Sequence, residues 1–230
     1  MEEKSAMGTR SVLDREMTRI RDDILRMGSL VGEAVERTYR ALRLQDAELA
    51  QDVVNGDDTL DFLCHDIERR IARTVALQQP TARDLRRLLA DLLITNELER
   101  MGDHAEGIAR TVLRYESETP IEIPPQLATM KSKVLDMLRQ AMDAYAAEAA
   151  TRAKEIARLD DEVDATYHDL FNRLINSMVK GRLPVEQGTY LLWAGHALER
   201  VGDRVTNICE RVVYTRTGDV DDLNPKPGEG

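Results

Sequence analysis

The sequence predicts an all-α protein made of two similar three-helix bundles. Gly and Pro are sparse, at 13 and 7 of 230 residues, and only 4% of residues are aromatic, which is typical of helical proteins. Apolar residues recur with the period of an α-helix. The hexapeptide Leu-Glu-Arg-x-Gly-Asp occurs at 98–103 and again at 198–203, with five of six positions identical. Such a repeat indicates an internal duplication.

The duplication extends beyond the hexapeptide. Residues 57–66 match residues 160–169 in three leading acids, a His and a closing Asp. The offset is 103 residues here and 100 at the hexapeptide, so the length difference falls around Pro80 and Pro184, where we expect turns between helices. We therefore place one repeat at 9–118 and the other at 124–217.

Three helices are expected in the first repeat. From Leu13 to Ala41 apolar residues alternate at spacings of four and three, which predicts a helix of about 32 residues and about 48 Å. Asp46 is placed to cap a second helix, which Pro80 ends. A third helix is expected from about Thr81 to Arg114.

The second repeat follows the same plan after a proline-containing linker at 116–125. Its helices are expected at about 126–152, 153–180 and 184–215. Residues 1–8 and the acidic Gly- and Pro-containing tail at 218–230 are expected to be disordered.

Charge and cysteine content limit the classes of function. The net charge of −10 disfavours nucleic acid and anionic lipid as direct partners. Cys64 and Cys209 are not equivalent in the repeats, so we expect buried free thiols and no disulfide or zinc site. No signal peptide opens the sequence, and no apolar run approaches the ~18 residues of a membrane span. A soluble cytoplasmic protein without direct membrane insertion is expected.

Paired carboxylates are the candidate site. Residues four apart on a helix share one face, about 6 Å apart. Six acidic pairs have this spacing, and four of them lie at equivalent positions of the duplicated blocks. These four pairs are Asp57 with Asp61, Glu99 with Asp103, Asp160 with Asp164, and Glu199 with Asp203.

The third helix places its acids on an apolar stripe. Leu85, Leu89 and Leu92 lie on one line, and Glu99 and Asp103 continue it, which predicts a core-facing seam that becomes acidic halfway along. A second apolar line takes over beside the acids and consists of Leu98, Met101, Ala105, Ile108 and Val112. Carboxylates beside a core are costly unless something neutralises their charge.

Two kinds of neutralising group are available. One is a structural ion-pair network through the duplicated Arg100 and Arg200. The other is metal, since four carboxylates from two helices offer hard oxygen ligands that suit iron, manganese or magnesium and tolerate zinc. Gly102 and Gly202 would let a neighbouring helix or ligand approach closely. Residues that could support such sites from behind the ligands are Arg100, Arg200, His65, His168, Asn96 and Asn207.

These motifs resemble the PhoU family, the accessory regulators of the high-affinity phosphate transporter. The resemblance covers roughly residues 10–216. It rests on the two Glu-Arg-x-Gly-Asp segments and the Asp-x-x-x-Asp segments, on a Pro-x-x-x-Asp-Leu-Arg helix start at 80–86, and on an Asn-Ile-x-Glu ending at 207–210. The two repeats differ at two of these positions. Gly107 stands in the first repeat where the second has Asn207, and Glu186 stands in the second repeat where the first has Asp84.

The resemblance implies pseudo-two-fold symmetry between the bundles and multinuclear metal clusters, often iron or zinc. It assigns Asp57, Asp61, Glu99 and Asp103 to one cluster, and the four acids of the second repeat to the other. It further implies a homodimeric, non-enzymatic repressor of the phosphate-starvation response that contacts the transporter's ATPase subunit and a sensor histidine kinase.

Two other functions stay open at this stage. A di-iron carboxylate oxidoreductase would use Glu-x-x-His on two helices, and the sequence contains no Glu-x-x-His. A metal-free helical scaffold is the other alternative. Direct binding of phosphate would require clusters of basic residues at helix N-termini. Arg83, Arg86 and Arg87 lie near the start of the third predicted helix, and we expect them to form a solvated face.

Overall fold

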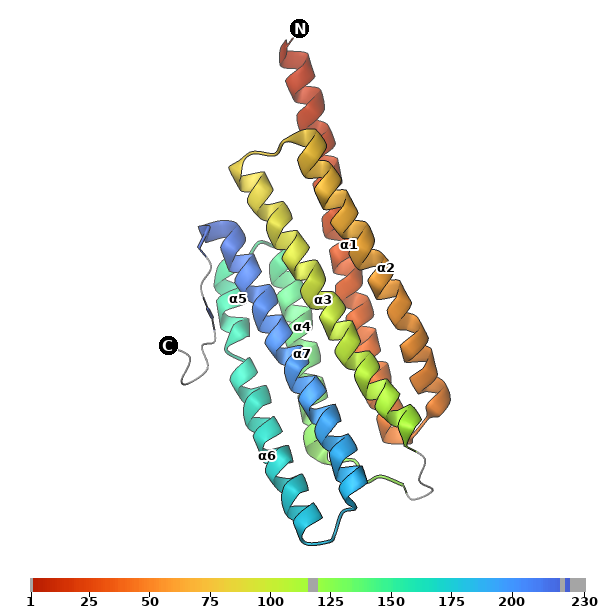
Figure 1. The fold of residues 1–230 in the computed structure, drawn as a ribbon. Coiled ribbons are helices and arrows are strands. Elements are labelled where there is room, and N and C mark those ends of the chain that lie inside the picture. The colour runs from red at the N-terminus through yellow and green to blue at the C-terminus, as the bar shows by residue number, and fades with distance from the viewer. Residues whose placement is uncertain (1, 116–119, 220–221, 224–230) are drawn as a thin grey trace.

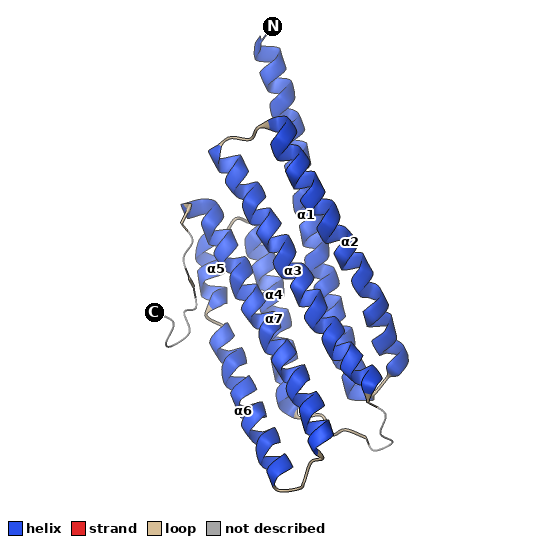
Figure 2. Cartoon of the chain, viewed as in Figure 1, coloured by secondary structure: helices blue, strands red, loops and turns tan. Residues whose placement is uncertain are grey.

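The computed structural model describes residues 2–115, 120–219 and 222–223. Within these residues the chain forms seven helices and no strand (Figures 1 and 2). None of these helices has a stretch long and apolar enough to cross a membrane. The helices are α1 Glu2–Leu44, α2 Ala47–Gln78, α3 Ala82–Arg114, α4 Pro125–Ala146, α5 Ala150–Ala157, α6 Asp160–Val179 and α7 Val185–Thr217.

As predicted, the helices form two three-helix units, and these units pack side by side. Helices α1, α2 and α3 form the first unit, while α4, the pair α5 and α6, and α7 form the second. The units meet where α3 lies along α7 and where α1 lies against α4 (Figure 1). The buried apolar side chains form one continuous cluster across both units, so the two repeats share a core.

Local chemistry explains where the helices begin and end. Asp46 caps α2 by accepting a hydrogen bond from the Leu49 amide at 3.0 Å, as predicted. Gln79 ends α2 in the left-handed conformation directly before Pro80. Pro125 occupies the first turn of α4, where its missing N–H costs nothing, and Gly218, with φ of 86°, ends α7.

The second repeat differs from the predicted boundaries. The segment expected as one helix at 126–152 ends at Ala146, because Glu148 adopts a left-handed φ of 51°. The next predicted helix, 153–180, is divided into α5 and α6 by a tight turn in which the Leu159 amide bonds the Ile156 carbonyl at 2.9 Å. Neither break involves Gly or Pro, the residues that mark turns most clearly in a sequence.

The N-terminal end of the chain also differs from expectation. Residues 2–8, expected to be disordered, form the start of α1, which extends past the rest of the bundle (Figure 1). In the tail, the Leu223 amide donates to Glu210 Oε1 at 3.2 Å, and the Leu223 side chain packs against the core. Residue 1 and, in the tail, residues 220–221 and 224–230 lie outside the described residues.

The predicted seam of α1 is correct, whereas the predicted seam of α3 is wrong. Leu13 and Ala41 are buried, as is the apolar line between them. On α3, however, Leu89 is 41% exposed, and Leu88 is buried in its place. The second apolar line, from Leu98 to Val112, is buried as predicted. Glu99 and Asp103 therefore lie at the edge of the core.

A buried polar pair links the two units and was missed from the sequence. Asp91 on α3 is fully buried and accepts a hydrogen bond from the Tyr145 hydroxyl of α4 at 2.7 Å. Burial raises the pKa of Asp91 to about 6, while this hydrogen bond and the charges of Arg87 and Arg21 act to lower it. The sequence feature that could have indicated this pair is Asp91 itself, a single acid at a core-facing position of α3.

Replacing Tyr145 by Phe is expected to destabilise the protein by about 1–3 kcal/mol, because Asp91 then stays buried without this donor. The loss should be larger at pH 8 than at pH 5. Without the hydrogen bond the pKa of Asp91 rises further above its unfolded value, so the native state loses stability as pH rises. Urea denaturation at both pH values measures this. Tyr214→Phe serves as control, and equal losses at both pH values would contradict the account.

Candidate metal centres

The first carboxylate cluster lies between α2 and α3. Asp57 and Asp61 come from α2 and Asp103 from α3, and one carboxylate oxygen from each lies within 4.8 Å of the other two. Glu99 lies one turn before Asp103 and outside this group of three, although its charge acts on Asp57 and Asp103 acts on it. Three of the four predicted carboxylates of this unit therefore converge.

The carboxylates of this first cluster repel one another. Among the described residues, no Lys or Arg forms an ion pair with any of the cluster's three aspartates or with Glu99. Burial, followed by the charges of Glu106 and the neighbouring carboxylates, raises the pKa of Asp57 to about 7. The pKa values of Glu99 and Asp103 are also raised, again mainly by burial. A cation at this point would relieve the repulsion.

Asp57 is expected to titrate near pH 7 in metal-free protein, far above its ordinary 3.8. Because the folded pKa is the higher one, the native state holds the proton more tightly, and stability should fall as pH rises from about 4 to 7. Carbon NMR of the Asp57 carboxyl checks the titration. Denaturation at pH 5 and pH 8 should show a loss that Asp57→Asn removes. Titration near pH 4 would contradict this reading.

The second cluster is more nearly neutralised. Asp160 and Asp164 from α6 and Asp203 from α7 bring carboxylate oxygens within 4.8 Å of one another. Arg200 donates from Nε and Nη2 to both oxygens of Glu199, at 2.8 and 3.0 Å, and its Nη1 lies 2.9 Å from Asp203 Oδ2. Bidentate bonds of this kind are strong. The ion-pair network that the sequence suggested as one way to neutralise the acids is therefore present in this unit.

The equivalent arginine behaves differently in the first unit. Arg100 is exposed and forms no ion pair with Glu99 or Asp103 among the described residues, although its charge lowers the pKa of both. Each cluster therefore contains three aspartates at equivalent positions. The clusters differ because Arg200 pairs with the acids next to it, whereas Arg100, within the described part of the chain, does not.

Each duplicated glycine lies at a close contact between two helices, Gly102 between α3 and α2 and Gly202 between α7 and α6. A Cβ on Gly102 would lie 2.6 Å from Leu60 Cδ1 and 3.1 Å from Asp57 Oδ1. A Cβ on Gly202 would lie 2.5 Å from Asp160 Oδ1. Each glycine thus removes a side chain where a carboxylate of the neighbouring helix packs, as close approach of the helices requires.

The structure does not bring the predicted histidines into either cluster. His65 Nδ1 lies 2.8 Å from the backbone oxygen of Asp61, and the exposed His168 ring lies 6.4 Å from that of Tyr167. Within the part of the chain that the structure describes, neither belongs to a group of converging ligands. On α7, His196 Nδ1 lies 3.4 Å from Glu199 Oε2.

The predicted asparagines also point elsewhere. Asn96 Oδ1 accepts from the Cys64 thiol at 3.7 Å. Asn207 donates to Glu97 at 3.1 Å, and Arg204 bonds the same carboxylate oxygen at 3.2 Å. This contact joins α3 to α7 and was not predicted; only the spacing of Arg204 and Asn207 on one helix face could have suggested it.

The donor set fits a metal ion. Carboxylate oxygens are hard ligands suited to iron, manganese or magnesium. In the first unit three of them converge without an ion-paired Lys or Arg among the described residues. Fold and site together define a duplicated all-α protein with one carboxylate cluster between helices of each unit.

Comparison with known proteins agrees with this description. The PhoU domain model matches residues 24–112 and again 127–212, and the chain belongs to the PhoU family, as the sequence motifs indicated. A "phosphate-specific transport system accessory protein PhoU homolog" of Clostridium acetobutylicum is 36% identical over 217 residues, covering 94% of this chain and 99% of that protein. A homolog of the same name from Streptococcus pneumoniae is 36% identical over 216 residues, covering 94% and 100%.

Solved structures match over nearly the whole chain. The crystal structure of the phosphate transport system regulatory protein PhoU from Streptococcus pneumoniae has a TM-score of 0.85 at 34% identity, covering 91% of this chain and 99% of that one. PhoU from Pseudomonas aeruginosa has a TM-score of 0.84 at 32% identity, with coverage of 90% and 99%. The predicted fold and family are both confirmed.

Proposed function

We propose that this chain is a cytoplasmic negative regulator of phosphate uptake and of the phosphate-starvation response. It acts as a metal-binding helical adaptor between the phosphate transporter and its sensor histidine kinase, without catalytic turnover. The family match and the names of the relatives, which are accessory proteins of phosphate-specific transport systems, support the regulatory part of this proposal.

The metal-binding part rests on one observation, the convergence of Asp57, Asp61 and Asp103 without an ion-paired Lys or Arg among the described residues. These aspartates would hold iron or zinc in the first unit, with manganese or magnesium as further candidates. Asp160, Asp164 and Asp203 would do so in the second. A metal bound there would supply positive charge between two helices of one unit, which would keep the exposed face around it in one shape for docking.

The metal-free scaffold has one observation in its favour, and it concerns the second unit. There Arg200 already neutralises Glu199 and Asp203. We therefore expect the first unit to bind metal more tightly than the second. The di-iron oxidoreductase has no such support, because the sequence lacks Glu-x-x-His.

A binding assay with purified components tests the adaptor role. Tagged protein, either metal-loaded or treated with chelator, is incubated with the transporter's ATPase subunit and with the cytoplasmic part of the sensor kinase. The proposal predicts that both are retained and that chelation weakens retention. Retention of neither component, with or without metal, would refute the adaptor role. Light scattering of the same samples tests the expected homodimer.

A further inference from the structure

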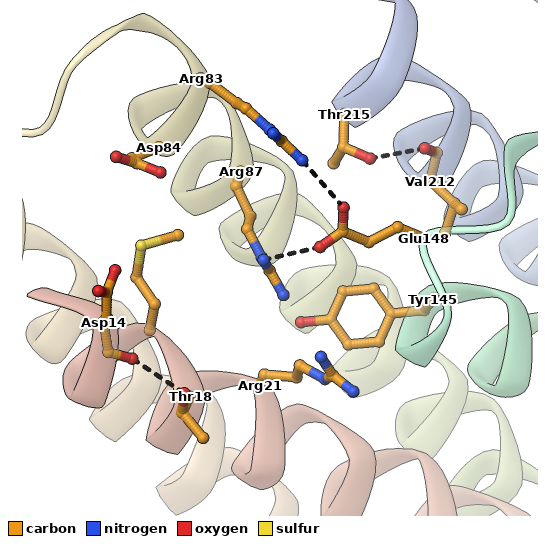
Figure 3. Close-up of a pocket in the computed structure, with 11 residues that line it drawn as sticks. Asp14, Thr18, Arg21, Arg83, Asp84, Arg87, Tyr145, Glu148, Val212 and Thr215 are labelled. Atoms are coloured by element: carbon orange, nitrogen blue, oxygen red, sulfur yellow. Dashed lines mark hydrogen bonds and ion pairs between the residues drawn. The ribbon is translucent and has the colours of Figure 1, made fainter.

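A cavity of about 340 Å³ lies at the junction of the two units and shares no lining residue with either carboxylate cluster. It is bounded by α1, the first turns of α3, the turn after α4 and the last turns of α7 (Figure 3). Arg87 in its wall is sixteen residues before Asp103 on α3, about 24 Å along the helix. Val212 is nine residues after Asp203 on α7, about 14 Å along that helix. The cavity is therefore separate from the candidate metal centres.

Three arginines from two helices line this cavity. Arg83 and Arg87 come from α3 and Arg21 from α1. Arg87 lies 2.7 Å and Arg83 3.5 Å from the carboxylate of Glu148. Arg21 forms no ion pair with any described residue, and its guanidinium lies beside Tyr145 on the side of the cavity that Arg87 also faces (Figure 3).

The acidic residues of the cavity lie apart from this arginine wall. Asp14 and Asp84 line the other side (Figure 3), and each has interactions of its own. Glu148 forms ion pairs with Arg83 and Arg87, and it does so from a left-handed turn with φ of 51°, a conformation that is strained for a residue with a Cβ. The charges of Arg21 and Arg87 also act on the buried Asp91. A carboxylate of the second unit is thus held by arginines of the first.

We propose that this cavity binds a small dianionic oxyanion of the phosphate class, which displaces the Glu148 carboxylate and bonds Arg21, Arg83 and Arg87. Arginine forks suit the oxygens of such an anion. A free monocarboxylate is disfavoured, since it would compete with a tethered carboxylate present at high effective concentration. A dianion brings twice the charge and enough oxygens to bond a third arginine.

Binding at this cavity would affect both three-helix units, because residues of both units line it. The arginines belong to the first unit, whereas Tyr145, Glu148 and Thr215 belong to the second. Release of Glu148 frees the turn that leads through α5 into α6, the helix that carries Asp160 and Asp164. The proposal itself does not depend on metal binding or on the adaptor role.

Calorimetric titration with inorganic phosphate tests the proposal. The full chain is treated with chelator, and ionic strength is held constant with sodium chloride. Saturable binding to one site is expected. Arg21→Gln should weaken binding tenfold or more, as loss of a charge-assisted hydrogen bond implies. Glu148→Gln should tighten binding roughly fivefold, because it removes the competing ion pair. Arg15→Gln, an exposed change on the same helix, should leave binding unchanged.

Three results would overturn the proposal. The first is absence of saturable binding in both the unaltered chain and Glu148→Gln. The second is equal affinity in Arg21→Gln, provided that circular dichroism shows this variant to be folded. The third is acetate binding as tightly as phosphate or sulfate, which would mean that two charges and a tetrahedral shape are not what the cavity recognises.

Discussion

Gly202→Ala is expected to destabilise the protein by about 1–3 kcal/mol. The added Cβ would lie 2.5 Å from Asp160 Oδ1, and Asp160 is only 1% exposed, so its carboxylate has little room to move. The loss must also exceed the gain of up to ~1 kcal/mol that Ala brings to a helix interior. A fall in melting temperature of several degrees is expected, since ~1 kcal/mol corresponds to about 2–4 °C in a protein of this size.

Gly107→Ala is the matched control for this substitution. Gly107 also lies inside a helix, yet a Cβ there meets nothing within 4 Å. It should stabilise the protein by about 0.5–1 kcal/mol through helix propensity alone. If both alanine variants raise the melting temperature, Gly202 is not required for the close approach of α6 and α7.

Metal is expected to raise the melting temperature of chelated protein by about 5–10 °C when its free concentration is a hundred times its dissociation constant. A ligand at that level contributes ~2.7 kcal/mol, which corresponds to the stated shift at about 2–4 °C per kcal/mol. This ~2.7 kcal/mol already includes the relief of repulsion among Asp57, Asp61 and Asp103, which is part of the binding free energy. Differential scanning calorimetry with iron(II) under anaerobic conditions, and with zinc, measures this shift.

Paired Asp-to-Asn variants measure how much each unit contributes to this rise in melting temperature. Asp61→Asn with Asp103→Asn should abolish most of the shift while leaving the chelated protein as stable as before or more so, because like charges are removed. Asp164→Asn with Asp203→Asn should have a smaller effect on the shift. The surface pair Asp136→Asn with Asp143→Asn, whose partner is the exposed Arg139, should leave it unchanged. An equal shift in all variants would place the metal elsewhere.

The sequence predicted most of the fold because the fold repeats. The hexapeptide at 98–103 and 198–203 marks the third helix of each unit, and the Asp-x-x-x-Asp segments mark the face that meets it. Prolines at 80, 125 and 184 lie at helix boundaries in the structure, as they did in the prediction.

The features that escaped prediction depend on tertiary contacts. Glu148 holds a left-handed turn while it bonds Arg87 of another unit, and nothing local to its sequence indicates this. Leu89 appeared to face the core because helical periodicity places a stripe on a face without saying which neighbour covers it. For the same reason, the duplicated Arg100 and Arg200 gave no sign that only Arg200 bonds its neighbouring acids.

Elemental analysis of protein purified without chelator tests the central claim most directly. We predict bound iron or zinc in the unaltered chain, with most of it lost when Asp61 and Asp103 are replaced by Asn and less lost when Asp164 and Asp203 are replaced. Metal-free protein as purified that also takes up no iron or zinc on reconstitution, or a metal content that neither pair of substitutions changes, would contradict the account.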